Sequence, residues 1–242
     1  MSGRLKRRDA FRAIAAGAAG AAVGRAPAAE APGAGGVLWS RRVPVRYEAD
    51  VAVIGGGIAG VSAACAAAKS GAKVVLVERF AVTGGMLTTG GVANFCGEMT
   101  GQGEVFDAIV ADLRAWNALG QDGRDSVFHP EVLAFVLQEL LLRRGVKLLL
   151  HARFADVRVV SGRITEALLC GKSGPEALRA RQWVDATGDA DVARAAGFAV
   201  AKGRPSDGLQ LPMSMMYFVR HVPPGASVPR KPDGWLHPIA SK

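Results

Sequence analysis

A short hydrophobic run that leads directly into a cluster of glycines constrains this chain more than any other feature. The run is Asp50–Ile54, and its β-branched residues are typical of a buried parallel strand. The glycines of Gly55–Gly60 follow at once, and small residues over 61–70 then predict a helix. A second strand over 73–77 ends at Glu78. Strand, glycine turn, helix, strand and terminal acid in this order predict a βαβ unit.

Each glycine of the turn has its own expected role. Gly55 allows the tight passage from strand to helix, Gly57 lets a pyrophosphate approach the backbone, and Gly60 lets the helix pack against the strand. Ile58 and Ala59 lie within the turn before the helix, whose free N–H groups and positive dipole end favour a bound phosphate. The turn therefore predicts a site for the pyrophosphate of a dinucleotide.

The acid at the end of the second strand completes this prediction. Glu78 follows the glycines at the spacing, about 20 residues, at which a carboxylate accepts hydrogen bonds from a ribose diol. The same negative charge would repel a 2′-phosphate, so the site disfavours NADP.

A second turn of small residues lies much later in the chain. A strand over 181–185 runs into Ala186-Thr187-Gly188, where the backbone can lie against a ligand. Asp189 is expected to cap a short helix over 190–196, which Gly197 ends. Alone this pattern is also that of an ordinary strand-to-helix turn, but together with the upstream unit it predicts a second cofactor contact.

These segments resemble FAD-dependent oxidoreductases of the glutathione-reductase-like flavoprotein superfamily. The resemblance rests on Gly55–Glu78 with Arg79 after it, on 84–91, on 184–189 and on the weaker match at 211–214. It implies FAD as the cofactor and places the 84–91 segment near the flavin pyrophosphate and isoalloxazine, although a flexible surface loop is the alternative there. The predicted cofactor-binding residues are Gly55, Gly57, Ile58, Ala59, Gly60, Glu78, Arg79, Gly85, Met86, Thr187, Gly188 and Asp189.

The predicted fold class is α/β, with a Rossmann-like FAD-binding domain over residues 48–200 built on a parallel sheet with flanking helices. Hydrophobic spacing predicts helices over 103–119 and 130–143 and a strand over 146–150. An antiparallel insert, with a hairpin over 154–170 and a third strand over 178–185, is expected to cover the sheet. Residues 201–242 are expected to begin an incomplete substrate domain. Met213–Phe218 within it suits either a strand facing a flavin or substrate pocket or plain core packing.

The first residues are typical of a signal peptide, predicted over 1–28 and followed by a linker over 29–47. Arg7 and Arg8 precede an uncharged Ala- and Gly-rich stretch, and Ala26-Pro27-Ala28 offers a cleavage site. The segment resembles a twin-arginine signal and is too short for a stable membrane span, so the protein is expected to be periplasmic or secreted. A disordered basic tail on a cytoplasmic protein is the alternative.

Charge and cysteine use exclude other classes. The chain has 30 Lys and Arg against 21 Asp and Glu, but much of the excess lies in the first 31 residues, so we expect no nucleic-acid partner. The three cysteines have no metal-binding or redox spacing, and the four histidines add no metal signature. Cys65 is expected to be buried on a helix face.

The implied activity is hydride transfer between FAD and a small organic substrate that the sequence does not identify. No general base is assigned, because His129 and His151 have no readable partner and flavin itself accepts the hydride. Residues 221–242 lack the strand and helix with which similar proteins close the FAD site, so the chain looks C-terminally truncated. Two hypotheses follow: an oxidoreductase completed by a second chain, or a nucleotide-binding module without turnover.

Overall fold

The computed structural model describes residues 40–120 and 125–216. The chain divides into two units, residues 1–43 and 44–242. Of the first unit only residues 40–43 are described, and they form no helix or strand. The predicted signal peptide and the segment 217–242 lie outside the described residues.

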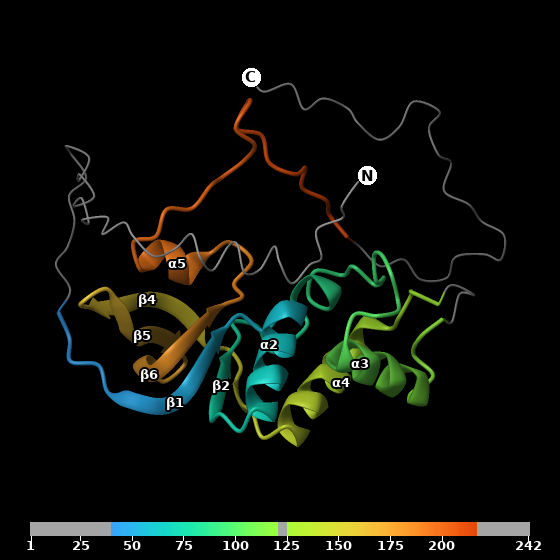
Figure 1. The fold of residues 1–242 in the computed structure, drawn as a ribbon, viewed down its shortest axis with the longest axis horizontal. Coiled ribbons are helices and arrows are strands. Elements are labelled where there is room, and N and C mark those ends of the chain that lie inside the picture. Colours follow the sequence, from blue (N-terminus) through green and yellow to red (C-terminus); the bar gives the residue numbers. More distant parts are fainter. Residues whose placement is uncertain (1–39, 121–124, 217–242) are drawn as a thin grey trace, which may run out of the picture. The chain divides into compact units, whose positions relative to one another are not determined.

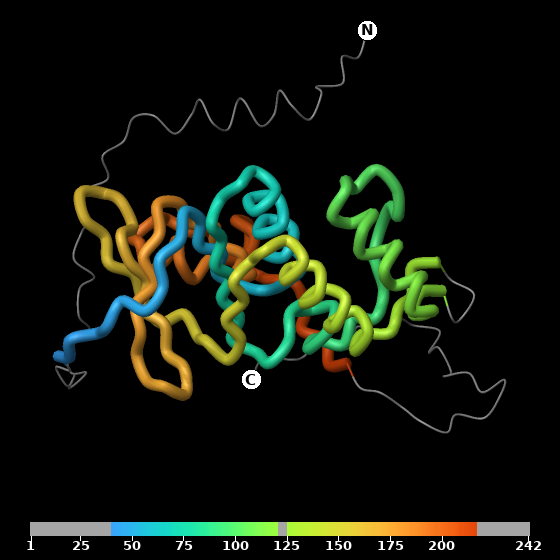
Figure 2. Tube along the Cα trace, turned by 90° about the horizontal axis from the view of Figure 1, so that it is seen from below, coloured from blue at the N-terminus to red at the C-terminus, as the bar shows by residue number. Residues whose placement is uncertain are grey.

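One six-stranded mixed sheet organises the second unit, with the strand order β3-β2-β1-β6-β5-β4. Its parallel strands are β1 (Val45–Ile54), β2 (Val74–Val77), β3 (Lys147–Leu149) and β6 (Gly174–Asp185). The antiparallel strands are β4 (Arg153–Val160) and β5 (Arg163–Gly171). Figure 2 shows β1 and β6, which lie near opposite ends of the described chain, running side by side. The predicted α/β fold with a parallel sheet and an antiparallel insert is confirmed.

Strand β1 is longer than its hydrophobic run. It begins at Val45, so the last residues of the predicted linker and the start of the predicted domain at 48 already belong to the sheet. Its first half pairs with β6 from Val45–Ala177 to Ala49–Ala180, and its second half pairs with β2 as well. Charged residues that alternate with apolar ones in this first half conceal the strand from a search for continuous hydrophobicity.

Three helices cover one face of the parallel strands (Figure 1): α2 (Ile58–Lys69), α3 (Glu104–Ala115) and α4 (Pro130–Arg143). Their apolar faces form one core with β1 and β2, in which Cys65 is fully buried as expected. Trp116, which directly follows α3, is 60% exposed. Its ring contacts that of Phe135 on α4, with centroids 5.1 Å apart.

The other face is covered by the antiparallel strands (Figure 1). Strands β4, β5 and β6 continue the sheet by hydrogen bonds and also pack back over it, so that Ala52 and Val75 share a second core with Leu169 and Leu178. The insert therefore covers the sheet as predicted, but as an extension of the sheet itself. Helix α5 (Asp191–Ala195) adds Val192 to this core.

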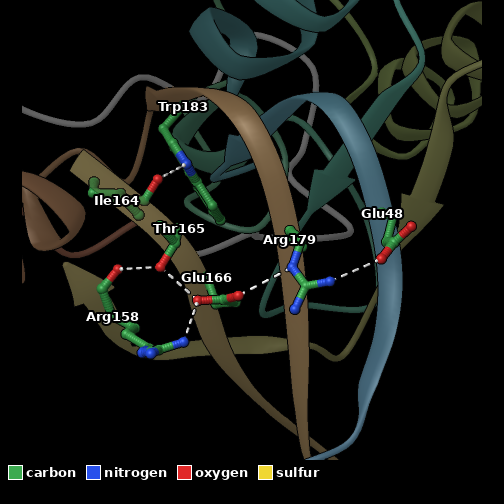
Figure 3. Close-up of polar contacts among 7 residues, drawn as sticks. All are labelled: Glu48, Arg158, Ile164, Thr165, Glu166, Arg179 and Trp183. Atoms are coloured by element: carbon green, nitrogen blue, oxygen red, sulfur yellow. Dashed lines mark hydrogen bonds and ion pairs between the residues drawn. The ribbon is translucent and has the colours of Figure 1, made fainter. Parts of the chain in front are cut away.

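Charged side chains link the four strands of this curved region (Figure 3). Arg179 on β6 lies between Glu48 on β1 and Glu166 on β5, at 3.2 and 3.0 Å. Glu166 also pairs with Arg158 on β4 at 3.4 Å and accepts a hydrogen bond from the Thr165 hydroxyl. The network joins neighbouring strands in the order β4-β5-β6-β1 and supports their register.

The segment after α5 differs from both expectations for it. Residues 209–216 form no strand, and Leu211, Met213 and Met215 are 92%, 99% and 87% exposed. Neither a strand nor core packing is therefore correct for the methionines up to Met216. Tyr217 and Phe218 lie outside the described residues.

Candidate functional site

A cavity of about 810 Å³ lies at the carboxyl ends of β1, β2 and β6. Parallel strands end at one edge of their sheet, and this edge is where ligands of open α/β sheets bind. The walls come from the turn after β1, from 77–80 after β2, from 85–90, from 152–155 at the start of β4 and from 186–195.

All but three of the predicted cofactor-binding residues line this cavity. Those that do are Gly55, Gly57, Glu78, Arg79, Gly85, Met86, Thr187, Gly188 and Asp189. Ile58, Ala59 and Gly60 form the first turn of α2 and are not lining residues. Their N–H groups lie at the helix start, where no intrahelical acceptor exists for them.

Two glycines of the turn serve the fold. Gly55 has a φ of +103°, and a Cβ there would collide with the carbonyl of Ala186, directly after the neighbouring strand β6. A Cβ on Gly60 would collide with the carbonyl oxygen of Gly55. The tight turn and the close approach of helix and strand therefore require glycine at both positions.

Gly57 differs from these two. Its φ of −65° and ψ of 177° suit any residue, and a Cβ there would meet no heavy atom within 4 Å. Gly57 nevertheless lines the cavity. A side chain at this position would project into open space beside the start of α2, so the missing Cβ enlarges the cavity and is not required by the fold.

Glu78 is 5% exposed and is held by two backbone groups. Its Oε2 accepts a hydrogen bond from the Gly56 N–H at 2.7 Å, and its Oε1 accepts one from the Phe80 N–H at 2.8 Å. Each carboxylate oxygen can accept a further hydrogen bond. The acid is therefore fixed in place and still able to bind a diol in the cavity.

The loop after Glu78 is attached to the glycine turn. The Gly84 N–H donates a 2.7 Å hydrogen bond to the Gly56 carbonyl oxygen, and Gly84 and Gly85 both have positive φ. The Thr88 hydroxyl donates to the Thr83 carbonyl oxygen at 2.7 Å, which ties the loop to itself. These bonds bring Gly85 to the cavity, while the Met86 side chain is 67% exposed.

The turn after β6 is organised by other residues than predicted. The prediction that Asp189 caps the short helix is wrong, since the residue directly before α5 is Ala190, whose own side chain makes no capping hydrogen bond. Asp185 instead accepts a hydrogen bond from the Ala193 N–H, and the Thr187 hydroxyl accepts one from the Asp191 N–H. A φ of +56° at Ala190 turns the chain so that residues further upstream reach the helix start.

The cavity also contains side chains that the motifs did not reveal. The Arg79 guanidinium lies over the Phe80 ring, 4.7 Å from its centroid, and Arg194 pairs with Asp191 at 2.9 Å. Arg153 lies at the start of β4. The signal for this position was the strand over 146–150, because residues after a parallel neighbour of β2 must reach the same edge of the sheet.

The two histidines considered as bases lie outside the cavity lining. His129 precedes α4 and its Nδ1 is 2.9 Å from the Glu131 carboxylate, while the backbone N–H of His151 donates to the Phe80 carbonyl oxygen. Across the part of the chain that the structure describes, no three His, Cys, Asp or Glu residues are grouped to hold a metal ion. None of the helices described has the length and hydrophobicity needed to cross a membrane.

The sequence matches the family described as "FAD dependent oxidoreductase" over residues 50–238, which is most of the chain. None of the curated proteins matches it. Solved structures with a similar fold include the myxobacterial chondrochloren halogenase CndH, at 20% identity and a TM-score of 0.48 over 62% of this chain and 39% of that one. THI4 of Thermovibrio ammonificans has 21% identity and a TM-score of 0.46 over 61% of each chain.

A third similar structure is a geranylgeranyl bacteriochlorophyll reductase-like protein of Thermoplasma acidophilum, at 20% identity and a TM-score of 0.47 over 63% of this chain and 42% of that one. The chain thus spans between 39% and 61% of the length of these three proteins. The family match covers both glycine turns and the acid between them. The chain therefore belongs to the FAD-dependent oxidoreductase family.

Proposed function

We propose that the protein holds FAD in the cavity at the carboxyl ends of β1, β2 and β6 and transfers hydride between the flavin and a small organic substrate. One observation carries the proposal. Gly57, Glu78 and Gly188 come from three separate segments of the chain and line one cavity. Chains of this family use FAD, and the matched region includes all three segments.

The residues fit the parts of FAD. Gly57 leaves space beside the first turn of α2, where free N–H groups of Ile58, Ala59 and Gly60 would hold the pyrophosphate. Glu78 would accept hydrogen bonds from the ribose, with Arg79 beside it. Gly85, Met86 and Thr187–Asp189 would contact the remainder of the cofactor. Bound FAD supplies the hydride acceptor, and the protein supplies orientation and exclusion of water.

Flavin content tests the proposal. The purified protein should show the flavin absorbance bands, and Glu78→Arg should remove them, because a carboxylate worth about 2–4 kcal/mol to the ribose is replaced by a bulky cation. Glu98→Arg, at an exposed glutamate in the loop before α3, is the matched control and should keep its flavin. Equal flavin in the parent protein and Glu78→Arg would contradict the proposal.

Reduction of the bound flavin separates the two hypotheses about activity. An oxidoreductase should lose its flavin absorbance anaerobically with a reduced substrate and regain it with an electron acceptor. A module that binds FAD without turnover should do neither. Turnover that appears only after addition of a second chain would indicate that this chain supplies the cofactor site and its partner supplies the substrate site.

We further propose that Arg7 and Arg8 direct export of the folded protein, with cleavage near Ala28. This rests on the sequence, because these residues lie outside those described. Replacement of both arginines by lysine keeps the charge but should retain the protein in the cytoplasm if a twin-arginine system reads the guanidinium pair. Unchanged export would indicate a general secretory signal, and intact cytoplasmic protein with residues 1–28 attached would indicate no signal.

A further inference from the structure

We propose that Asp185 is a positioning residue for the cofactor, which it serves by fixing the loop 187–189 that lines the cavity. The inference rests on the FAD site proposed above and goes beyond it, because Asp185 is not a lining residue and belongs to none of the predicted contacts. Asp185 is the last residue of β6, and its carboxylate lies between the loop and helix α5.

Three hydrogen bonds converge on this carboxylate. Its Oδ1 accepts from the Thr187 N–H at 3.1 Å and from the Thr187 hydroxyl at 2.7 Å. Its Oδ2 accepts from the Ala193 N–H at 2.9 Å. One side chain therefore joins the end of β6, the first loop residue and the second half of the first turn of α5.

The Thr187 hydroxyl extends this set of bonds. An ionised carboxylate only accepts hydrogen bonds, so the hydroxyl proton must point toward Asp185. The oxygen of the same hydroxyl then accepts from the Asp191 N–H at 2.9 Å. Loss of the carboxylate would remove the bonds from Thr187 and Ala193 and would free the Thr187 hydroxyl to rotate, which would weaken the bond from Asp191.

The loop needs such support because its backbone is not one that its residues prefer. Gly188 tolerates its φ of +88°, but Ala190 has a φ of +56°, in the left-handed region that alanine disfavours. Upstream, the loop is fixed to the end of β1, since the Ala186 N–H donates to the Ile54 carbonyl oxygen at 2.8 Å. Asp185 supplies the corresponding attachment downstream.

Asp185 would affect the affinity for the cofactor by setting how often the loop has its cavity-lining shape. Gly188 and Asp189 line the cavity, as do Asp191 and Arg194 on α5. Without Asp185 the loop would adopt its cavity-lining shape for only a fraction of the time. The apparent dissociation constant for a ligand rises as that fraction falls.

The test compares Asp185→Ala with Asp50→Ala. Asp50 is a matched control, because its Oδ2 likewise accepts from a backbone N–H, that of Lys73 at 2.9 Å, at the amino-terminal end of β2 and away from the cavity. We expect Asp185→Ala to raise the dissociation constant for FAD about tenfold and Asp50→Ala to change it less than about twofold. Equal effects of the two changes would overturn the inference.

Two further variants show whether Asp185 acts through Thr187. Asp185→Asn keeps the volume and one acceptor oxygen, so it should keep the Thr187 bonds, lose the Ala193 bond and give an intermediate dissociation constant; it also replaces the alanine variant if that one does not fold. Thr187→Val removes the hydroxyl. Its effect on FAD binding should be smaller in the Asp185→Ala background than in the parent, because contacting residues are coupled. Independent, additive effects would overturn the inference.

Hydrogen exchange of the FAD-free protein gives a readout that does not need the cofactor. In Asp185→Ala the amides of Thr187, Asp191 and Ala193 should exchange faster than in the parent protein, while the amides of α2 should not change. Unchanged exchange of all three amides would overturn the inference even if the protein binds FAD. A parent protein that binds no FAD would refute the proposed function, and this exchange pattern would still show whether Asp185 holds the loop.

Discussion

The backbone N–H of Gly56 donates a 2.7 Å hydrogen bond to Oε2 of Glu78, across the paired ends of β1 and β2. A Cβ on Gly56 would lie 2.9 Å from that same oxygen, so the glycine turn and the acid are in direct contact. Because Glu78 is 5% exposed, this bond is shielded from water. Glu78 thus stabilises the glycine turn, and it also lines the cavity in which it is proposed to bind the ribose.

Glu78→Gln should therefore destabilise the protein even when no flavin is present. An amide keeps one acceptor oxygen but presents an NH2 group to the second backbone N–H, either that of Gly56 or that of Phe80. We expect a loss of about 1–3 kcal/mol in the free energy of unfolding, measured with urea on the FAD-free protein. Glu98→Gln is the control, and an unchanged free energy of unfolding in Glu78→Gln would show that Glu78 does not stabilise the glycine turn.

Serine substitutions at two glycines should separate folding from cofactor binding. Gly57→Ser should fold as well as the parent protein, because the Cβ meets open space and serine is favoured before a helix. It should bind FAD weakly, because its side chain enters the cavity. Gly60→Ser should lose about 1–3 kcal/mol or more of stability through collision with the Gly55 carbonyl. Thermal unfolding and flavin titration measure both effects, and tight FAD binding by Gly57→Ser would contradict the assignment.

The charge network of the curved strands should make stability depend on acid pH. The hydrogen bond from Thr165 lowers the pKa of the Glu166 carboxyl below its usual 4.5, and Arg179 and Arg158 lower it further against the opposing effect of burial. A carboxyl whose pKa is lower in the folded state contributes stability that is fully present above its unfolded pKa and is lost as pH falls through the folded one.

Glu166→Gln should therefore destabilise the protein by about 0.5–1 kcal/mol near pH 7, a small value because both arginines are exposed. The difference from the parent protein should shrink as pH falls below 4.5. Urea unfolding across this range measures it, with Glu98→Gln as a control outside the network. A difference that stays constant with pH would show that the charge of Glu166 does not contribute.

Only two of the three cysteines should react in the folded protein. Burial raises the pKa of the Cys65 thiol, which lies on α2 and is fully buried in the core, whereas Cys96 and Cys170 are exposed. A thiol reagent at pH 8 should modify two thiols quickly and the third only in denaturant, since the thiolate is the reactive form. Mass spectrometry identifies the sites, and rapid modification of Cys65 would contradict the core described for α2.

The sequence predicted local units better than their connections. The strand, glycine turn and helix at 50–69 were evident because each element has its own composition, and α4 begins at Pro130 and ends at Arg143 as the proline and the apolar spacing indicated. The hairpin of β4 and β5 was also predicted, as a hairpin over 154–170. These features depend on neighbouring residues only.

What the sequence did not reveal depends on distant partners. The first half of β1 is a strand because β6 pairs with it, and the cap of α5 is Asp185 because a left-handed Ala190 brings the end of β6 within reach. Arg153 and Phe154 reach the cavity only through the parallel pairing of β2 with β3. The exposure of Met213 could not be read from its apolar character.

The position of β6 beside β1 has a consequence for how the protein folds. Ile54 pairs with Asp185, so the cavity wall forms between residues separated by most of the described chain. The β1–α2–β2 unit and the β4–β5–β6 meander can each form from contacts between neighbours, whereas closing the long loop between β1 and β6 is entropically costly and slow. Acquisition of FAD should accordingly be a late event in folding, so that flavin binding reports completion of the sheet and not its initiation.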